Sequence, residues 1–271
     1  MEPFVLNNRS LFTIDQWMNE FPGLVAGITS KQGGISRGSF DSLNMGFHVG
    51  DDVTDVCSNR ENVAKLLEFP LENWVGAEQT HDILIKKISK ADRGRGSSSY
   101  DLAFKGTDGF YTKESEVLLT LCFADCVPLF FIAPQARMIG AAHAGWKGTV
   151  RQIAREMIKA WEQEEIRPEE VFVAIGPSIC KKCYIVDNRV INLVENILED
   201  VDRKPYNLIN GNQYCLDLRE VNVQILLKAG VPEKNIVVTD LCTSCDEQFF
   251  SHRRDQGSTG RMLSFIGWKE I

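Results

Sequence analysis

Two histidines and a cysteine have the residue types and the positions of a metal centre. His81, Cys126 and His143 each stand at the edge of a strand-length apolar segment, where the chain is stiff but open to solvent. Two imidazoles and a thiolate give three protein ligands, the pattern of a catalytic zinc ion whose fourth position is left for water. Spacing alone leaves simpler roles open, because each histidine could be an ordinary turn residue and Cys126 a packed thiol.

Short motifs in a fixed order along nearly the whole chain carry a family resemblance. They are Gly33-Gly34-Ile35-Ser36, Ser42-Leu43-Asn44-Met45-Gly46, His48-Val49-Gly50-Asp51, Asn59-Arg60, Gln79-Thr80-His81, Thr107-Asp108-Gly109, Ala124-Asp125-Cys126, His143-Ala144-Gly145-Trp146, Gly176-Pro177-Ser178-Ile179, Cys183-Tyr184 and Phe250-Ser251-His252-Arg253-Arg254-Asp255. On these motifs the chain resembles the YfiH/YlmD family, whose members were once called laccase-domain or polyphenol oxidase proteins.

The resemblance implies both a metal and a reaction. It implies that His81, Cys126 and His143 bind zinc and that the substrates are purine nucleosides and phosphate. It further implies a transferase reaction in which adenosine, inosine, guanosine and methylthioadenosine are cleaved by phosphate to the free base and a ribose-1-phosphate. Hydrolytic deamination of adenosine is the second implied activity.

Deamination also needs a group that moves protons. A zinc ion with an open position lowers the pKa of its bound water to about 7, so this water can act as a nucleophile at neutral pH. In well-known nucleobase deaminases a glutamate of a His-x-Glu signature moves the proton. Neither His81 nor His143 has a glutamate two residues later. Asp125, beside Cys126, is therefore the first candidate for the proton shuttle, and Asp108 is the second. Support of a metal ligand and formation of a turn are the alternative roles of these two carboxylates.

Five more side chains are candidates for substrate binding. Lys147 lies in a glycine-containing turn before a predicted helix, where backbone N–H groups and the helix dipole would suit phosphate. Arg60 and Arg253 are rival anion contacts, because a guanidinium binds phosphate in a bidentate manner. Asn44 and Gln79 could hydrogen-bond ribose or base. The simpler alternatives are solvent exposure for the lysine, ion pairing for the arginines and turn formation for the amides.

Two CxxC pairs form a separate group of cysteines, Cys180 with Cys183 and Cys242 with Cys245. Two such pairs are typical of a four-cysteine zinc site. Here, however, the pairs are farther apart in sequence than in a zinc ribbon, and Cys183 belongs to one of the family motifs. Packing or redox-reactive thiols are therefore the expected roles, and a second metal is the alternative.

Length, composition and charge are those of an ordinary folded protein. The chain has 271 residues, of which 44% are hydrophobic and 25% charged, and its formal net charge is −7. No run of lysines or arginines could follow a nucleic-acid backbone, so we expect no nucleic-acid partner. No apolar run approaches the ~20 residues of a membrane span, and a secretory signal is lacking. We expect a cytoplasmic protein with reduced thiols, for which a homo-oligomer is compatible with the sequence.

Predicted strands and helices are interspersed along the chain. The predicted strands are Leu24–Ile28, Ile83–Ile88, Val117–Phe123, Leu129–Ala133, Met138–Ala142, Val171–Ile175 and Ile236–Leu241. The predicted helices are Val53–Leu67, Thr149–Glu164 with a Thr149–Gln152 capping box, Val190–Val201, and one from Asp217 to Gly230. Because strands crowd the region before His143, we expect an α+β fold with mixed sheets. Residues 1–271 would form one domain, a layered α/β/β/α-type sandwich.

Three other functions fit the same residues. In a metal-free hydrolase, Cys126 would be the nucleophile and His143 or His81 its base. A copper ion could replace zinc and oxidise phenols, since two histidines and a cysteine are also the trigonal set of a blue-copper site. A multicopper oxidase, however, needs many more than the four histidines present. A non-enzymatic metal-buffering or redox-sensing protein built on the CxxC pairs would show reversible thiol oxidation and no turnover.

Overall fold

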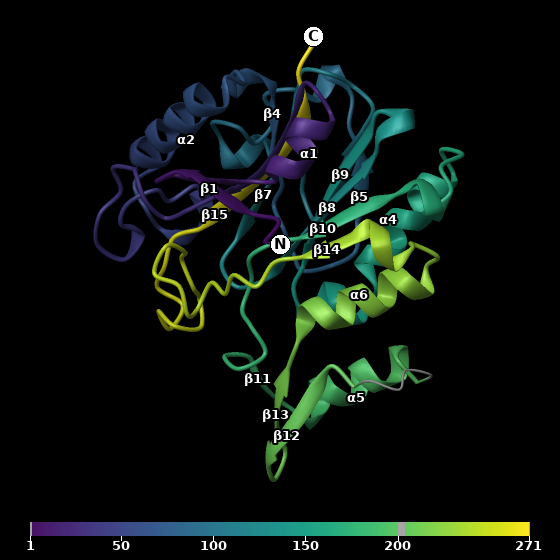
Figure 1. Cartoon of the computed structure of the whole chain (residues 1–271). Coiled ribbons are helices and arrows are strands. Elements are labelled where there is room, and N and C mark those ends of the chain that lie inside the picture. Colours follow the sequence, from purple (N-terminus) through teal and green to yellow (C-terminus); the bar gives the residue numbers. More distant parts are fainter. Residues whose placement is uncertain (1, 200–203, 271) are drawn as a thin grey trace.

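The computed structural model describes residues 2–199 and 204–270, and within them two six-stranded mixed sheets form the centre of the fold (Figure 1). The first sheet has the order β1 (Val5–Asn8), β2 (Leu11–Thr13), β3 (Leu24–Thr29), β15 (Met262–Trp268), β7 (Val117–Phe123) and β4 (Trp74–Val75). The second has the order β14 (Ile236–Val238), β10 (Phe172–Ile175), β8 (Val127–Ala133), β9 (Met138–Ala144), β6 (Gly109–Thr112) and β5 (Ile85–Lys87). Parallel pairs, β4–β7, β10–β14 and β5–β6, lie at sheet edges.

The central strands are buried on both faces, which explains their continuous apolar runs. Along β8, Phe130 and Ile132 point into a core shared with the first sheet. Leu129 and Phe131, on the opposite face, pack in a second core with helices α4 (Ile153–Glu162) and α6 (Leu218–Lys228). The two sheets therefore face each other, and helices cover the outer face of the second.

Helix α2 (Val53–Leu67) covers the outer face of the first sheet (Figure 1). Its Val63 and Leu67 pack with Trp74 and Leu118 of that sheet. The expected α+β fold with α/β/β/α layers is thus confirmed. None of the described helices is both long and apolar enough to span a membrane.

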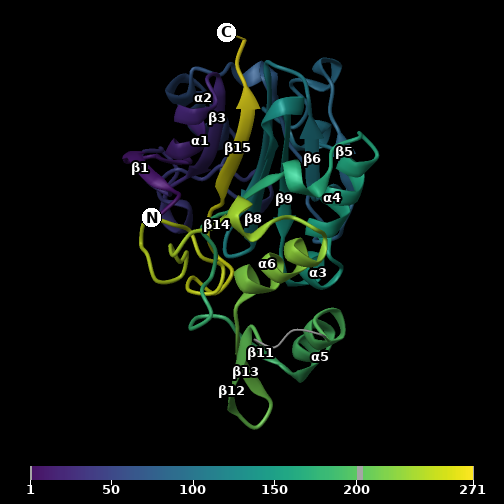
Figure 2. The same cartoon turned by 45° about the vertical axis from the view of Figure 1, so that its right-hand side comes forward.

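A smaller lobe projects beyond α6 (Figure 2). It contains helix α5 (Asn188–Ile197) and a three-stranded antiparallel sheet of β11 (Ile185–Asp187), β13 (Gln213–Leu216) and β12 (Tyr206–Asn210). This sheet was not expected from the sequence. Nearly all of its side chains are exposed or only partly buried, so its strands lack the continuous apolar pattern of the central sheets.

Most predicted elements are present, with one break. Helix Val53–Leu67 and strand Val117–Phe123 have the predicted bounds, and Asp217 caps α6 by accepting hydrogen bonds from two backbone N–H groups. The predicted helix Thr149–Glu164 is wrong as one unit. It is divided into α3 (Trp146–Val150) and α4, because Gln152 adopts a left-handed backbone with φ of 64°.

Two further predictions need correction at their ends. The Thr149–Gln152 capping box is wrong, since Gln152 is itself the N-cap of α4 and makes no side-chain cap hydrogen bond. Helix α5 begins before the predicted Val190 and ends at Ile197; residues 200–201 of the predicted helix lie outside the described residues. A short helix, α1 (Asp15–Glu20), packs against β3 and was not predicted.

Candidate metal centre

His81, Cys126 and His143 come together although they are far apart in sequence. Their ligand atoms all lie within 4.8 Å of one another. Cys126 directly precedes β8, and His143 lies in the neighbouring β9 opposite Pro128. His81 comes from the loop between β4 and β5 and has a left-handed backbone with φ of 61°. The hairpin of β8 and β9 thus fixes two donors, and a loop supplies the third.

Asp108 positions two of the three donors. Its carboxylate is fully buried, and its Oδ1 lies 2.8 Å from Nδ1 of His143. The same oxygen accepts a hydrogen bond from the backbone N–H of His81, at 3.0 Å. The other oxygen accepts from the N–H groups of Thr80 and Asp82. The His81 loop and the His143 ring are therefore held by a single carboxylate, which leaves Nε2 of His143 for a metal.

Charges within the centre favour a thiolate beside an imidazolium when no metal is bound. Burial alone would raise the pKa of Cys126, but the charge of His143 and hydrogen bonds from His143 and His81 lower it to about 6. Burial would lower the pKa of His143, whereas the Cys126 thiolate and Asp108 raise it to about 9. The thiol is thus ready either to bind a metal or to act as a nucleophile.

Alkylation should reveal this low thiol pKa directly. In metal-free protein, we expect the rate of Cys126 alkylation by iodoacetamide to rise with pH through a midpoint near 6, because only the thiolate reacts. Cys57 on α2 is the internal control, since it is similarly half-buried and burial raises its pKa above the ordinary value. Peptide-level mass spectrometry measures both rates in one sample. Equal midpoints for the two cysteines would contradict the assigned electrostatics.

A glycine leaves room beside the donors. A Cβ atom at position 145 would lie 2.9 Å from Sγ of Cys126 and 2.9 Å from Cδ2 of His81. Contacts this short force a neighbour to move, so Gly145 allows the backbone to approach both donors closely.

A cavity of about 510 Å³ opens over the three donors. Its wall carries three cationic side chains, Lys147, Arg253 and Arg261. Four further wall residues have aromatic or imidazole rings, namely His48, Trp146, Tyr184 and His252. A cavity of this size and mixed lining suits a small organic anion or a nucleoside-sized ligand.

Sequence reasoning missed Arg261 and His48 as cavity residues. Asn44 Oδ1 accepts a hydrogen bond from the backbone N–H of Arg261, at 2.9 Å, which ties a residue near the C-terminus to the Asn44 motif. The pKa of His48 is lowered to about 4, first by burial and then by the neighbouring charge of Arg261. His48 is therefore a neutral ring at pH 7. Its presence in a family motif was the one available signal, whereas Arg261 had none.

Asp125 lies in the cavity wall, but both of its oxygens are engaged. Oδ1 accepts a hydrogen bond from the Thr243 hydroxyl at 2.6 Å, and Oδ2 accepts from the backbone N–H of Arg253 at 2.7 Å. The residue is only 8% exposed. Asp125 therefore joins the candidate metal centre to two C-terminal loops.

Asn44 and Arg60 do not reach the cavity, which corrects their predicted substrate contacts. Asn44 is fully buried, and its amide bonds to the backbone of Gly46 and the carboxylate of Asp51. Arg60 is 3% exposed and donates hydrogen bonds to the carbonyls of three residues, Met45, Gly96 and Ser97. These contacts join the Asn44 segment to the 94–97 loop, so both side chains stabilise the fold.

Removal of the Arg60 guanidinium should therefore destabilise the fold. In Arg60→Met the apolar stem is kept, but three buried carbonyls lose their donor, and we expect a loss of about 3 kcal/mol in the free energy of unfolding. Urea denaturation measures the loss. The control is Arg155→Met on the exposed face of α4, which should change stability by less than ~0.5 kcal/mol. Equal stability of the two variants would contradict the structural role of Arg60.

Gln79 and Lys147 differ in what they can offer a ligand. Gln79 lines the cavity, but its amide is paired with the backbone of Cys122, with distances of 2.9 and 2.7 Å. Lys147 also lines the cavity. Its helix, α3, has only five residues and no side-chain cap, so the predicted anion site at a long, capped helix N-terminus is wrong. Its ammonium lies 5.8 Å from the ring centroid of Trp146, another residue of the wall.

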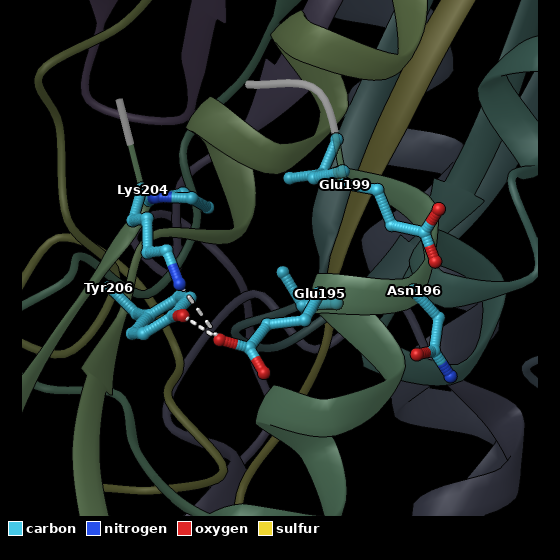
Figure 3. A pocket seen from close by; sticks show the side chains of 8 residues that line it. Glu195, Asn196, Glu199, Lys204 and Tyr206 are labelled. Atoms are coloured by element: carbon cyan, nitrogen blue, oxygen red, sulfur yellow. Dashed lines mark hydrogen bonds and ion pairs between the residues drawn. The ribbon is translucent and has the colours of Figure 1, made fainter. Parts of the chain in front are cut away.

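A second cavity, of about 250 Å³, lies between α5 and β12 (Figure 3). Glu195 points across it to Lys204 and Tyr206, and its carboxylate bonds to both. Among the described residues, its lining contains neither histidine nor cysteine. The described part of its lining offers carboxylates but no imidazole or thiolate, so the cavity over His81, Cys126 and His143 is the stronger candidate for a transition-metal centre.

Known proteins resemble this chain over almost its full length. The family model described as "Multi-copper polyphenol oxidoreductase laccase" matches residues 25–269. "Purine nucleoside phosphorylase YlmD" of Geobacillus stearothermophilus is 53% identical over 252 residues, 92% of each chain. "Purine nucleoside phosphorylase YlmD" of Bacillus subtilis is 48% identical over 273 residues, covering 99% of this chain and 98% of the relative.

A solved structure gives the same result in three dimensions. The crystal structure of YlmD from Geobacillus stearothermophilus superposes with a TM-score of 0.97 at 50% sequence identity, and all of both chains is covered. The resemblance found in the sequence motifs is thereby confirmed. The chain belongs to the multi-copper polyphenol oxidoreductase laccase family, together with the YlmD proteins.

Proposed function

We propose that this protein is a zinc-dependent purine nucleoside phosphorylase that also deaminates adenosine. The observation that carries the proposal is the group of three donors beneath a cavity of about 510 Å³ with cations in its wall. The names of the two YlmD relatives, both purine nucleoside phosphorylases, support the reaction class. The substrates would be adenosine, inosine, guanosine or methylthioadenosine with phosphate, and the products a purine base and the ribose-1-phosphate.

The donor set fits zinc in number, type and support. Two nitrogens and one sulfur leave a fourth tetrahedral position open, and the buried Asp108 carboxylate fixes the ring of His143. Zinc would supply Lewis acidity, which lets water or a substrate oxygen react near neutral pH. His81, Cys126 and His143 would hold the ion, and Asp108 would keep the first and last of them in place.

Copper fits less well, although the family description mentions it. The same three donors could hold one copper ion. A multicopper centre needs many more histidines, and the sequence has only two others, His48 and His252. Phenol oxidation is therefore the weaker candidate.

The cavity wall would bind the two substrates. Lys147, Arg253 and Arg261 would surround phosphate with positive charge, and Arg253 and Arg261 can each offer a guanidinium fork. Trp146 and Tyr184 provide ring surfaces for a purine. Asp125 would act as a positioning residue, because it holds the backbone N–H of Arg253 at 2.7 Å.

Incubation of the zinc-loaded protein with inosine and phosphate tests the proposal. Hypoxanthine and ribose-1-phosphate should appear in equal amounts, and omission of phosphate should stop their formation. Adenosine without phosphate should give inosine. Chromatography with mass detection measures each product. Failure of zinc-loaded protein to turn over any of the four nucleosides would refute the proposed function.

A further inference from the structure

Four cysteines outside the metal centre form a second cluster. The Sγ atoms of Cys180, Cys183, Cys242 and Cys245 all lie within 4.8 Å of one another. Sγ of Cys245 lies 3.3 Å from that of Cys183 and 3.9 Å from that of Cys180. Zinc–sulfur bonds of ~2.3 Å in a tetrahedron place the sulfurs roughly 3.8 Å apart. The cluster therefore has the dimensions of a four-thiolate zinc site.

The fold explains how two distant CxxC pairs meet. Strands β10 and β14 are parallel neighbours, with Ile175 opposite Val238, so both chains leave the sheet at the same edge. A further parallel bridge joins Ser178 to Cys242. The long separation in sequence is occupied by the projecting lobe and α6. The distance between the two pairs in sequence therefore does not indicate their distance in space. The prediction of packed or redox-reactive thiols rested on that sequence distance and loses its main support.

A backbone turn closes each CxxC pair. The N–H of Cys183 donates to the carbonyl of Cys180, and the N–H of Asp246 donates to the carbonyl of Cys242, both at 3.0 Å. In addition, the N–H of Cys180 donates to Sγ of Cys242 at 3.2 Å. A backbone N–H directed at a sulfur stabilises the negative charge of a thiolate.

We propose that this cluster binds a second zinc ion of the structural type, held by all four thiolates. Four cysteines saturate a tetrahedral zinc and leave no position for substrate. Binding of one Zn²⁺ by four thiols releases four protons and leaves a complex of charge −2. Lys181 and Lys182 stand inside the first CxxC pair and partly offset that charge. Cys245 is exposed, which gives the ion a path of entry.

A zinc ion at this place would brace the wall of the active cavity. Ile179 and Tyr184 flank the first CxxC pair, and both line the cavity. Thr243 lies inside the second pair, and its hydroxyl binds Asp125, the neighbour of Cys126. The lobe that begins with β11 leaves the body of the protein directly after Tyr184 (Figure 2). One ion would thus fix two wall segments and the base of the lobe.

Zinc counting on matched variants tests this site separately from the proposed function. Under reducing conditions, the zinc content of the purified protein, measured by elemental mass spectrometry, should be two ions per chain in the wild type and one in Cys245→Ser. Cys215→Ser, a half-buried cysteine on β13 outside the cluster, should keep two. His81→Ala should keep one, and the double variant of His81 and Cys245 none.

The counts separate the failure of one zinc site from that of the other. If His81→Ala leaves the wild-type count unchanged while Cys245→Ser lowers it, the second site stands and the zinc of the proposed function fails. If Cys245→Ser leaves the count unchanged, the second site is refuted. Iron in place of zinc, or disulfides among the four cysteines of the protein as isolated, would also overturn the proposal.

A second measurement avoids any variant of the cluster. X-ray absorption at the zinc edge of His81→Ala should show four sulfur neighbours at ~2.3 Å, whereas nitrogen or oxygen neighbours would contradict the four-thiolate site.

Thermal unfolding tests whether the second zinc ion stabilises the fold. We expect the melting temperature of Cys245→Ser to fall by roughly 5–10 °C. A Cys245→Ser melting temperature equal to that of Cys215→Ser would contradict that role.

Discussion

Replacement of His81 by alanine should abolish metal binding at the centre and nucleoside turnover together. The imidazole is one of the three donors that the described residues bring within 4.8 Å of one another at this centre, and two remaining protein ligands hold zinc poorly. We expect phosphorolysis and deamination to fall by more than about 100-fold, because both would depend on the same ion. Zinc content and initial rates, measured on the same preparation, check the two losses.

The matched control for this variant is His252→Ala. His252 also lines the cavity but does not belong to the donor group, so its removal should leave the zinc content unchanged. A metal-free hydrolase with Cys126 as nucleophile would behave differently. It would keep activity without zinc, and Cys126→Ser would be far more damaging than His81→Ala. The metal account requires that His81→Ala and Cys126→Ser lose activity equally and completely.

Asp108→Asn should have the second largest effect. The substitution keeps the size of the side chain but removes its charge and one acceptor oxygen, while His143 and the N–H groups of Thr80, His81 and Asp82 all face this group. Loss of such a support typically weakens metal binding 10- to 100-fold. Competition with a chelator of known affinity measures the change.

Asp82→Asn provides the control for the charge. Asp82 is an exposed aspartate beside the same loop, and its carboxylate pairs with Arg151 on the surface. Surface pairs contribute little to stability, so this variant should bind zinc as the wild type does. Unchanged zinc affinity in Asp108→Asn would show that the carboxylate does not orient His143.

The layers of the fold could be predicted because central strands and amphipathic helices have strong patterns. The strand Val117–Phe123 is apolar except for Thr120, since both of its faces are covered, and the helix Val53–Leu67 begins at a capping aspartate. The break at Gln152 could not be predicted. A left-handed residue there interrupts an apolar pattern that continues on both sides.

The donors of the candidate centre could be predicted by type, but most of their surroundings could not. Arg60 has the chemistry of an anion contact, yet the structure buries it against backbone carbonyls. Asn44 likewise holds the backbone of Arg261 instead of facing the cavity. Whether a polar side chain faces a ligand or the backbone depends on how distant loops pack. A local sequence pattern does not predict that packing. The two CxxC pairs show the same limit, because a parallel strand pair brings them together.

Zinc removal followed by stepwise re-addition tests the central claim most directly. Protein stripped of zinc should cleave no inosine in the presence of phosphate, and activity should return in proportion to the zinc regained by the centre of His81, Cys126 and His143. The His81→Ala variant should show no recovery at any zinc concentration. Phosphorolysis that survives complete zinc removal would contradict the account.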